Sequence, residues 1–135
     1  MAWQTYGLDR EAQKLVLAAK KRDADSLNQS FKMRMTAAYG LERFWGEQLR
    51  LRGKEQSKAD YWKETWDSLV KIMDKAGIKL PNHSDIEITS QQLWGDIPIV
   101  EGDASTKLSL NDQRIALAVL TQFCDCLVWW TQRYK

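Results

Sequence analysis

A chain of 135 residues, 44% of them hydrophobic, has enough apolar material to bury a core as a single domain without a metal or a disulfide, which excludes the intrinsically disordered class. Its formal net charge of +2 is unevenly spread: residues 1–63 hold 13 Lys/Arg and 8 Asp/Glu, whereas residues 64–135 hold 7 and 10. A basic first half and a mildly acidic second half suit a protein with a polyanion on one side and protein on the other.

The first predicted helix covers residues 9–21, with Asp9 as its N-cap. At 100° of rotation per residue, Arg10, Lys14 and Lys21 align on one side, and apolar residues line up opposite them. This is the pattern of an amphipathic helix with a basic outer surface.

The second predicted helix covers residues 27–52 and ends at Gly53. Gly40 and Gly46 lie inside it and mark either close packing or a kink. Its basic strip holds one aromatic residue and consists of Lys32, Tyr39, Arg43 and Arg50, continued by Lys54. The main core face is expected to be Leu27, Phe31, Met35, Ala38, Leu41, Trp45 and Leu49, with a second apolar side made of Met33, Ala37, Phe44 and Leu51.

The third predicted helix covers residues 58–76, with Ser57 as its cap, Asp60 in the capping-box position and Gly77 at its end. Trp62 and Trp66 lie on its core face. The last predicted helix covers residues 110–133 and starts from Ser109. Because it is apolar around most of its circumference, it is either the central helix of a bundle or covered by another chain.

Residues 78–108 lack helical periodicity and are rich in acidic side chains. The alternating segments 86–89 and 97–100 are candidates for a short hairpin, with Pro98 limiting the second to an edge. The sequence therefore predicts an all-α single domain, a bundle of four main helices with an irregular, possibly hairpin-containing insertion before the last.

Catalysis and a cofactor are not expected from these residues. His83, the only histidine, lies in a polar segment, and no phosphate-binding glycine loop is present. Cys124 and Cys126 point apart on a helix, so they neither pair nor form a zinc site, and reduced thiols favour a cytoplasmic protein. Asp96, Glu101 and Asp103 leave a divalent cation as an alternative to an ordinary acidic loop.

Neither a signal peptide nor a membrane span is expected. The most apolar segment, residues 115–130, contains Asp125 and falls short of the roughly 18 uncharged apolar residues of a span.

The two basic strips, one of them with an aromatic ring, are typical of a surface that follows a nucleic-acid backbone. The candidate contact residues are Arg10, Lys14, Lys21, Lys32, Tyr39, Arg43, Arg50 and Lys54. The alternative is an ordinary solvated surface on a protein-only adaptor, which docks partners through tryptophans and the apolar last helix. Candidate partner contacts are Trp3, Trp94 and Trp129.

Three segments, in order, resemble the helical small subunits of multisubunit CRISPR effector complexes, especially those of type III. They are Phe31-Lys32 through Tyr39-Gly40-Leu41 to Phe44-Trp45, then Tyr61-Trp62 through Trp66-Asp67-Ser68-Leu69, then Ala116–Leu120 through Leu127-Val128-Trp129-Trp130. Residues 78–108 depart from the pattern. The resemblance implies a compact all-α fold.

It also implies a non-catalytic subunit that stacks beside other subunits, including copies of itself. Its basic face would then lie along a guide–target RNA duplex or a displaced single DNA strand. By position on the helix, Lys32, Arg43 and Arg50 would be the contacting residues.

Overall fold

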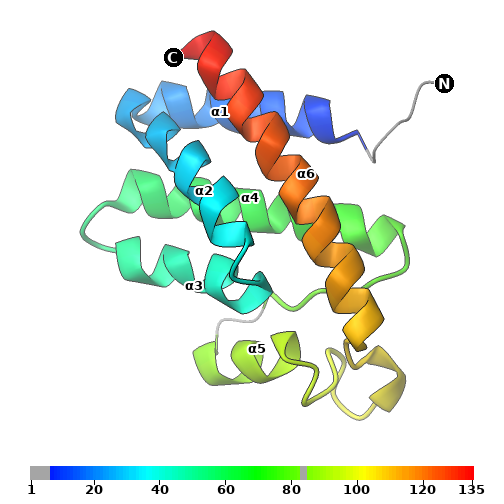
Figure 1. Cartoon of the computed structure of the whole chain (residues 1–135). Coiled ribbons are helices and arrows are strands. Elements are labelled where there is room, and N and C mark those ends of the chain that lie inside the picture. Colours follow the sequence, from blue (N-terminus) through cyan, green and yellow to red (C-terminus); the bar gives the residue numbers. More distant parts are fainter. Residues whose placement is uncertain (1–6, 83–84) are drawn as a thin grey trace, which may run out of the picture.

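A computed structural model describes residues 7–82 and 85–135, so Trp3 and His83 lie outside the described residues. Within them the chain is all-α and contains no strand (Figure 1). The α-helices are α1 (Leu8–Arg22), α2 (Gln29–Ala37), α3 (Leu41–Leu51), α4 (Gln56–Lys75), α5 (Ile86–Leu93) and α6 (Leu110–Tyr134), and two 3₁₀ turns are η1 (Ala24–Asn28) and η2 (Ala104–Thr106).

The longest helix, α6, packs against both α1 and α2, while α3 packs on α4. Helices α1 and α4 run antiparallel, so the beginning of α1 lies beside the end of α4 (Figure 1). Residues of α1 to α6 contribute to one hydrophobic cluster. The first and the last described helices, α1 and α6, therefore share one hydrophobic core.

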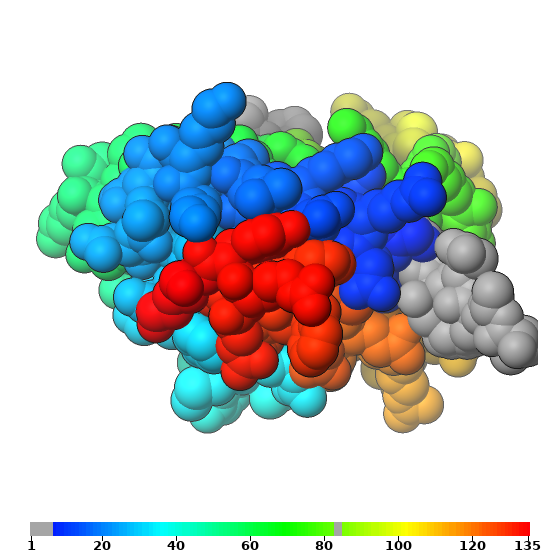
Figure 2. All heavy atoms as spheres, turned by 90° about the horizontal axis from the view of Figure 1, so that it is seen from above, coloured from blue at the N-terminus to red at the C-terminus, as the bar shows by residue number. Residues whose placement is uncertain are grey.

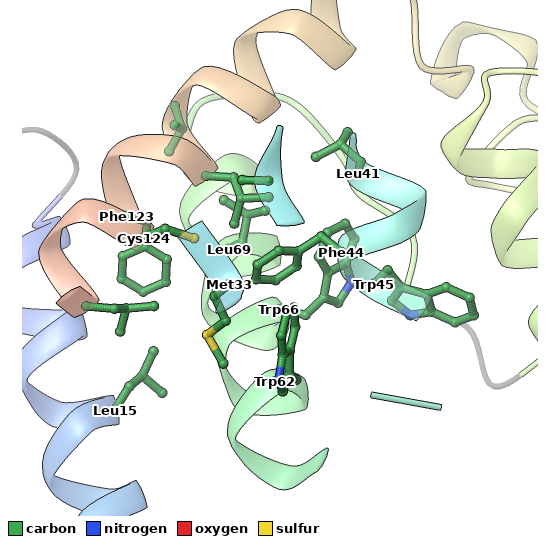
Figure 3. Packing of buried hydrophobic residues seen from close by; sticks show 14 of the residues in the cluster. Leu15, Met33, Leu41, Phe44, Trp45, Trp62, Trp66, Leu69, Phe123 and Cys124 are labelled. Atoms are coloured by element: carbon green, nitrogen blue, oxygen red, sulfur yellow. The ribbon is translucent and has the colours of Figure 1, made fainter. Parts of the chain in front are cut away.

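Tryptophans of α4 form the centre of that core. Trp62 and Trp66 are at most 1% exposed, and the Phe44 ring lies 4.9 Å from that of Trp62 (Figure 3). Each indole N–H has a partner: Trp62 donates to Gln29 Oε1 at 2.9 Å, and Trp66 donates to the Pro81 carbonyl at 3.0 Å. Such pairing avoids the penalty of about 1–3 kcal/mol for an unsatisfied buried donor.

The single helix predicted for residues 27–52 is wrong. It begins as the 3₁₀ turn η1, continues as α2, breaks at residues 38–40 and resumes as α3. Gly40 has φ +101°, a conformation that L side chains rarely adopt, so the glycine marks a break rather than close packing. The rotation angle between α2 and α3 residues is consequently not that of one straight helix.

This break also reverses the expected faces of α2. Met35, expected in the core, is 71% exposed, whereas Met33 and Ala37 of the second apolar side are fully buried. In α3, by contrast, Leu41 and Trp45 of the main face are buried, as predicted. The prediction counted 100° per residue through residues 38–40, where the chain is not helical. The predicted core face is therefore correct for α3 but not for α2.

The hairpin expected from residues 86–89 and 97–100 is also wrong, because residues 86–93 form α5. The Asp85 carboxylate accepts a hydrogen bond from the Ile88 N–H at 3.0 Å and caps this helix. The remaining loop folds back on itself through Thr106, whose hydroxyl accepts from the Val100 N–H at 2.9 Å.

Helix ends were predicted with mixed success. Ser109 caps α6 through the Asp112 N–H, and Gly77, with φ +84°, follows the end of α4, as expected. Helix α1 begins after Gly7, so Asp9 lies in its first turn and is not its cap. Ser57 does not cap α4, which begins at Gln56.

Helix α6 is long enough, and an 18-residue stretch of it with a mean hydropathy of 1.2 is apolar enough, to cross a membrane by length and composition alone. Its buried residues belong to the common core, and the helix packs against α1 and α2. Seen from above, its C-terminal end lies against α1 (Figure 2).

Candidate nucleic-acid interface

An open groove of about 420 Å³ lies where the α2–α3 turn, the end of α5 and the start of α6 meet. Residues far apart in the sequence line it. They are Tyr39, Gly40, Leu41, Glu42 and Arg43 from the turn and α3, Leu93 from the end of α5 and Trp94 directly after it, and Leu110, Gln113, Arg114 and Leu117 from α6. The groove thus brings together two predicted nucleic-acid contacts, Tyr39 and Arg43, with a predicted partner contact, Trp94.

Large apolar side chains at this groove are exposed to solvent. Tyr39 is 70% exposed, Trp94 is 59% exposed and Leu110 is 62% exposed. Aromatic rings held at a groove offer flat faces to another flat, apolar group, such as a nucleobase. Exposed apolar side chains that gather at one place are typical of a binding surface.

The position of Trp94 is fixed by the turn that ends α5. Gly95 follows with φ +81°, and a Cβ there would lie 2.4 Å from the Leu108 carbonyl oxygen and 3.0 Å from Gln113 Nε2. Only glycine allows this close approach, which ties the end of α5 to the start of α6. Trp94 and Leu110 are therefore held on the same groove by backbone contact.

The charge around the groove is positive. The Arg43 guanidinium lies 5.7 Å from the centre of the Tyr39 ring. Neither Arg43 nor Arg114 forms an ion pair within residues 7–82 and 85–135. The carboxylate of Glu42 accepts a hydrogen bond from the Ser90 hydroxyl at 3.3 Å. Two free guanidinium groups next to two aromatic rings can bind phosphate and base at the same place.

The strip predicted on α1 separates into two parts. Arg10 and Lys14 line a second hollow of about 420 Å³, together with Lys71 and Lys75 of α4. Lys21 is two turns further along α1, is exposed and does not line that hollow.

Lys32 and Arg50 both lie close to the carboxylate of Glu47. Arg50 makes two hydrogen bonds of 2.7 Å to it, and these lower the pKa of Glu47, with a smaller contribution from Lys32. Because its charge is already matched, Arg50 is a weaker candidate for phosphate than its exposure suggests.

Lys54 lies in the turn between α3 and α4 and lines a depression with Asp23, Asp25, Glu55 and Lys58, and Lys58 is paired with Glu55 at 3.1 Å. Three carboxylates there disfavour a polyanion. The cations predicted to form one continuous strip therefore occupy several separate places.

Trp129 is 56% exposed, and the Arg133 guanidinium lies 5.8 Å from the centre of its ring. Nineteen residues of α6 separate Trp129 from Leu110, which corresponds to about 28 Å along the helix. Trp129 therefore belongs to a different surface from the groove.

Sequence patterns did not reveal three of the cations at these two hollows. They are Arg114 of α6 and Lys71 and Lys75 of α4, none of which was predicted as a nucleic-acid contact. Lys71 and Lys75 do share the i,i+4 spacing of Arg10 and Lys14, a signal of a second basic strip. Pairing the two strips requires knowing that α1 and α4 are neighbours.

No group of three or more His, Cys, Asp or Glu residues able to hold a metal occurs among the described residues. Burial raises the pKa of the Cys126 thiol to about 12, with nearby Asp9 adding to the rise, and burial also raises that of Cys124. Neither thiol is activated as a nucleophile. No protein-family model, curated protein or solved structure matches this chain.

Proposed function

We propose that this protein is a non-catalytic nucleic-acid-binding subunit of an RNA-guided defence ribonucleoprotein, and that it holds a strand in the groove between α3, α5 and α6. One observation carries the nucleic-acid part. Two exposed rings, Tyr39 and Trp94, line one groove together with Arg43 and Arg114, which form no ion pair with any residue that the structure describes. The sequence resemblance to CRISPR small subunits supports the assignment to a defence complex.

The chemistry of the groove favours a single strand over a duplex. Stacking on Tyr39 or Trp94 requires a base whose face is open, and paired bases inside a duplex do not offer one. The arginines then bind the phosphates on either side of the stacked base. The groove keeps Tyr39 and Arg43 of the predicted strip and adds Trp94 and Arg114 to them.

A binding experiment with matched variants tests the groove. Tyr39→Ala combined with Trp94→Ala should weaken binding of a labelled single-stranded RNA or DNA by about 5- to 150-fold for each stacked base that is lost. Arg43→Gln combined with Arg114→Gln should also flatten the salt dependence, by about 0.7 in log–log slope per phosphate contact. Fluorescence anisotropy at several salt concentrations measures both effects.

The matched control is Trp129→Ala with Arg133→Gln, which removes the same kinds of side chain from the other end of α6. It should leave binding unchanged. Equal weakening by this control, or wild-type binding by the groove variants, would show that the groove is not the nucleic-acid site.

A protein partner is a second candidate function, favoured by the exposed Trp129 with Arg133 beside it and by Met35, which is 71% exposed. Tryptophan and arginine are enriched among residues that dominate protein interfaces. On this reading the protein is an adaptor, and Trp129→Ala weakens partner binding regardless of added RNA. A subunit of a larger complex would use both surfaces.

A further inference from the structure

The hollow between α1 and α4 shares no residue with the groove and is lined by cations on both walls. Arg10 and Lys14 come from α1, and Lys71 and Lys75 come from α4. On each helix the two cations are four residues apart, which places their backbone positions about one turn, or about 6 Å, from each other along the axis. The antiparallel helices thus present two pairs of positive charges across one hollow of about 420 Å³.

The positive charge of this hollow is only partly neutralised. Its two carboxylates are those of Glu11, 3.7 Å from Lys14, and Asp74, 3.5 Å from Lys79, which lies outside the hollow. Arg10, Lys71 and Lys75 form no ion pair with any residue that the structure describes. Three cations are therefore available to an incoming anion.

The uncharged groups lining the hollow also suit an anion. Gly7 precedes α1 and provides no side-chain cap to its first turn. Ser68 adds a hydroxyl that can donate. The floor includes Ile72, a side chain with no polar group to compete.

We propose that this hollow binds a chain of linked phosphates, such as the triphosphate of a free nucleotide or of an RNA 5′ end. Four cations on two walls match a ligand that carries several negative charges along its length, and linked phosphates have this property whereas a single small anion does not. The guanidinium of Arg10 suits two oxygens of one phosphate, and the lysines act as point charges on the others. This site does not depend on the function proposed for the groove.

Inorganic tripolyphosphate is the direct probe, measured by isothermal titration calorimetry against sodium sulfate at matched ionic strength. Wild-type protein should bind tripolyphosphate and show a higher Tm in its presence, whereas sulfate should have little effect. Lys71→Gln with Lys75→Gln should weaken binding about tenfold or more, because two charge-assisted hydrogen bonds are lost. Absence of tripolyphosphate binding would overturn the proposal.

Two matched variants separate this site from others. Lys20→Gln with Lys21→Gln removes two exposed lysines from the other end of α1 and should leave binding intact. The groove variant Tyr39→Ala with Trp94→Ala should also keep tripolyphosphate binding while losing single-strand affinity. Equal loss in the lysine control would show general attraction to a basic protein and would overturn the proposal.

Competition identifies the source of the phosphates. ATP and an RNA with a 5′-triphosphate should both displace tripolyphosphate, and whichever competes at the lower concentration is the better ligand. An RNA of the same sequence with a 5′-hydroxyl should compete more weakly than its triphosphate form. If it competes equally well, the hollow binds the nucleic-acid backbone instead of a phosphate chain.

Discussion

Three buried hydroxyl groups tie together helices that are distant in the sequence. Ser30 Oγ lies 2.5 Å from Tyr61 Oη and 2.6 Å from Thr131 Oγ1, linking α2, α4 and α6. All three side chains are fully buried. Burial raises the pKa of Tyr61 to about 12, against the smaller lowering effect of its hydrogen bonds to Ser30 and Thr131.

This shift predicts that the protein loses stability in alkali. An unfolded tyrosine gives up its proton near pH 10, whereas Tyr61 in the folded protein keeps it until about pH 12. Between these values the unfolded state binds fewer protons, so the free energy of unfolding falls as pH rises, by up to about 1.4 kcal/mol per pH unit. Tyr61→Phe should remove this part of the decline.

Urea unfolding at pH 9, 10 and 11 measures the effect. Tyr61→Phe should be about 1 kcal/mol less stable at neutral pH, because a buried hydrogen bond is lost, but should decline less steeply above pH 10. Tyr39→Phe, at an exposed position, serves as the control with the wild-type profile. An equally steep decline for wild type and Tyr61→Phe would contradict the assignment.

At the scale of the element, Gly95 lets the end of α5 pass close to the Leu108 carbonyl, where a Cβ would not fit. Gly95→Ala should destabilise the protein and move Trp94 away from α6. Two effects add to the cost. A residue with a Cβ loses about 1–2 kcal/mol at a positive φ, and the new Cβ would lie only 2.4 Å from the Leu108 carbonyl oxygen, which would have to move. Single-strand affinity should fall as well, because Trp94 leaves the groove.

Gly102 provides a close control for this change. Its φ is +82°, almost that of Gly95, but a Cβ there would meet nothing within 4 Å. Gly102→Ala should therefore cost only the backbone strain and leave nucleic-acid binding intact. Thermal unfolding and anisotropy on both variants measure the comparison; equal effects on binding would show that the Gly95 contact does not set the groove.

Local signals explain which elements were predictable. The Ser109 cap and Gly77 after α4 depend only on a few residues next to each other in the sequence, and both predictions are confirmed. Helix α5 was missed because alternating Ile86-Glu87-Ile88-Thr89 favours a strand, whereas the cap at Asp85 favours a helix. The break at Gly40 depends on a positive φ, which composition alone does not reveal.

For the whole molecule, periodicity gives the angle between residues on one helix but not which helices are neighbours. Periodicity correctly placed Arg10 and Lys14 together. It could not show that Lys71 and Lys75 line the same hollow, because that depends on how α1 and α4 pack. It also joined Tyr39 and Arg43, while adding Trp94 to them required the position of α5. The groove was therefore predictable as separate residues and not as a site.

Folding must bring the first and last helices together, since α6 packs on α1 and α2. Thr131 bonds to Ser30, Tyr134 accepts from Gln13 at 2.9 Å, and Lys135 donates to Asn28 at 2.6 Å. Figure 2 shows this end of α6 lying on the N-terminal helices. With one hydrophobic cluster spanning α1 to α6, we expect a single cooperative unfolding transition.

A chain that ends at Val128 tests this cooperativity. It lacks the three bonds above and the half-buried Trp130, so the free energy of unfolding should fall by about 3 kcal/mol or more. Far-UV circular dichroism and tryptophan fluorescence should still change at the same urea concentration, because α4 is packed in the same core as α6. Trp129→Ala, at a 56% exposed position, should alter stability by less than about 1 kcal/mol. Two separated transitions in the full-length protein would instead mean that α6 and the α3–α4 pair fold as independent units.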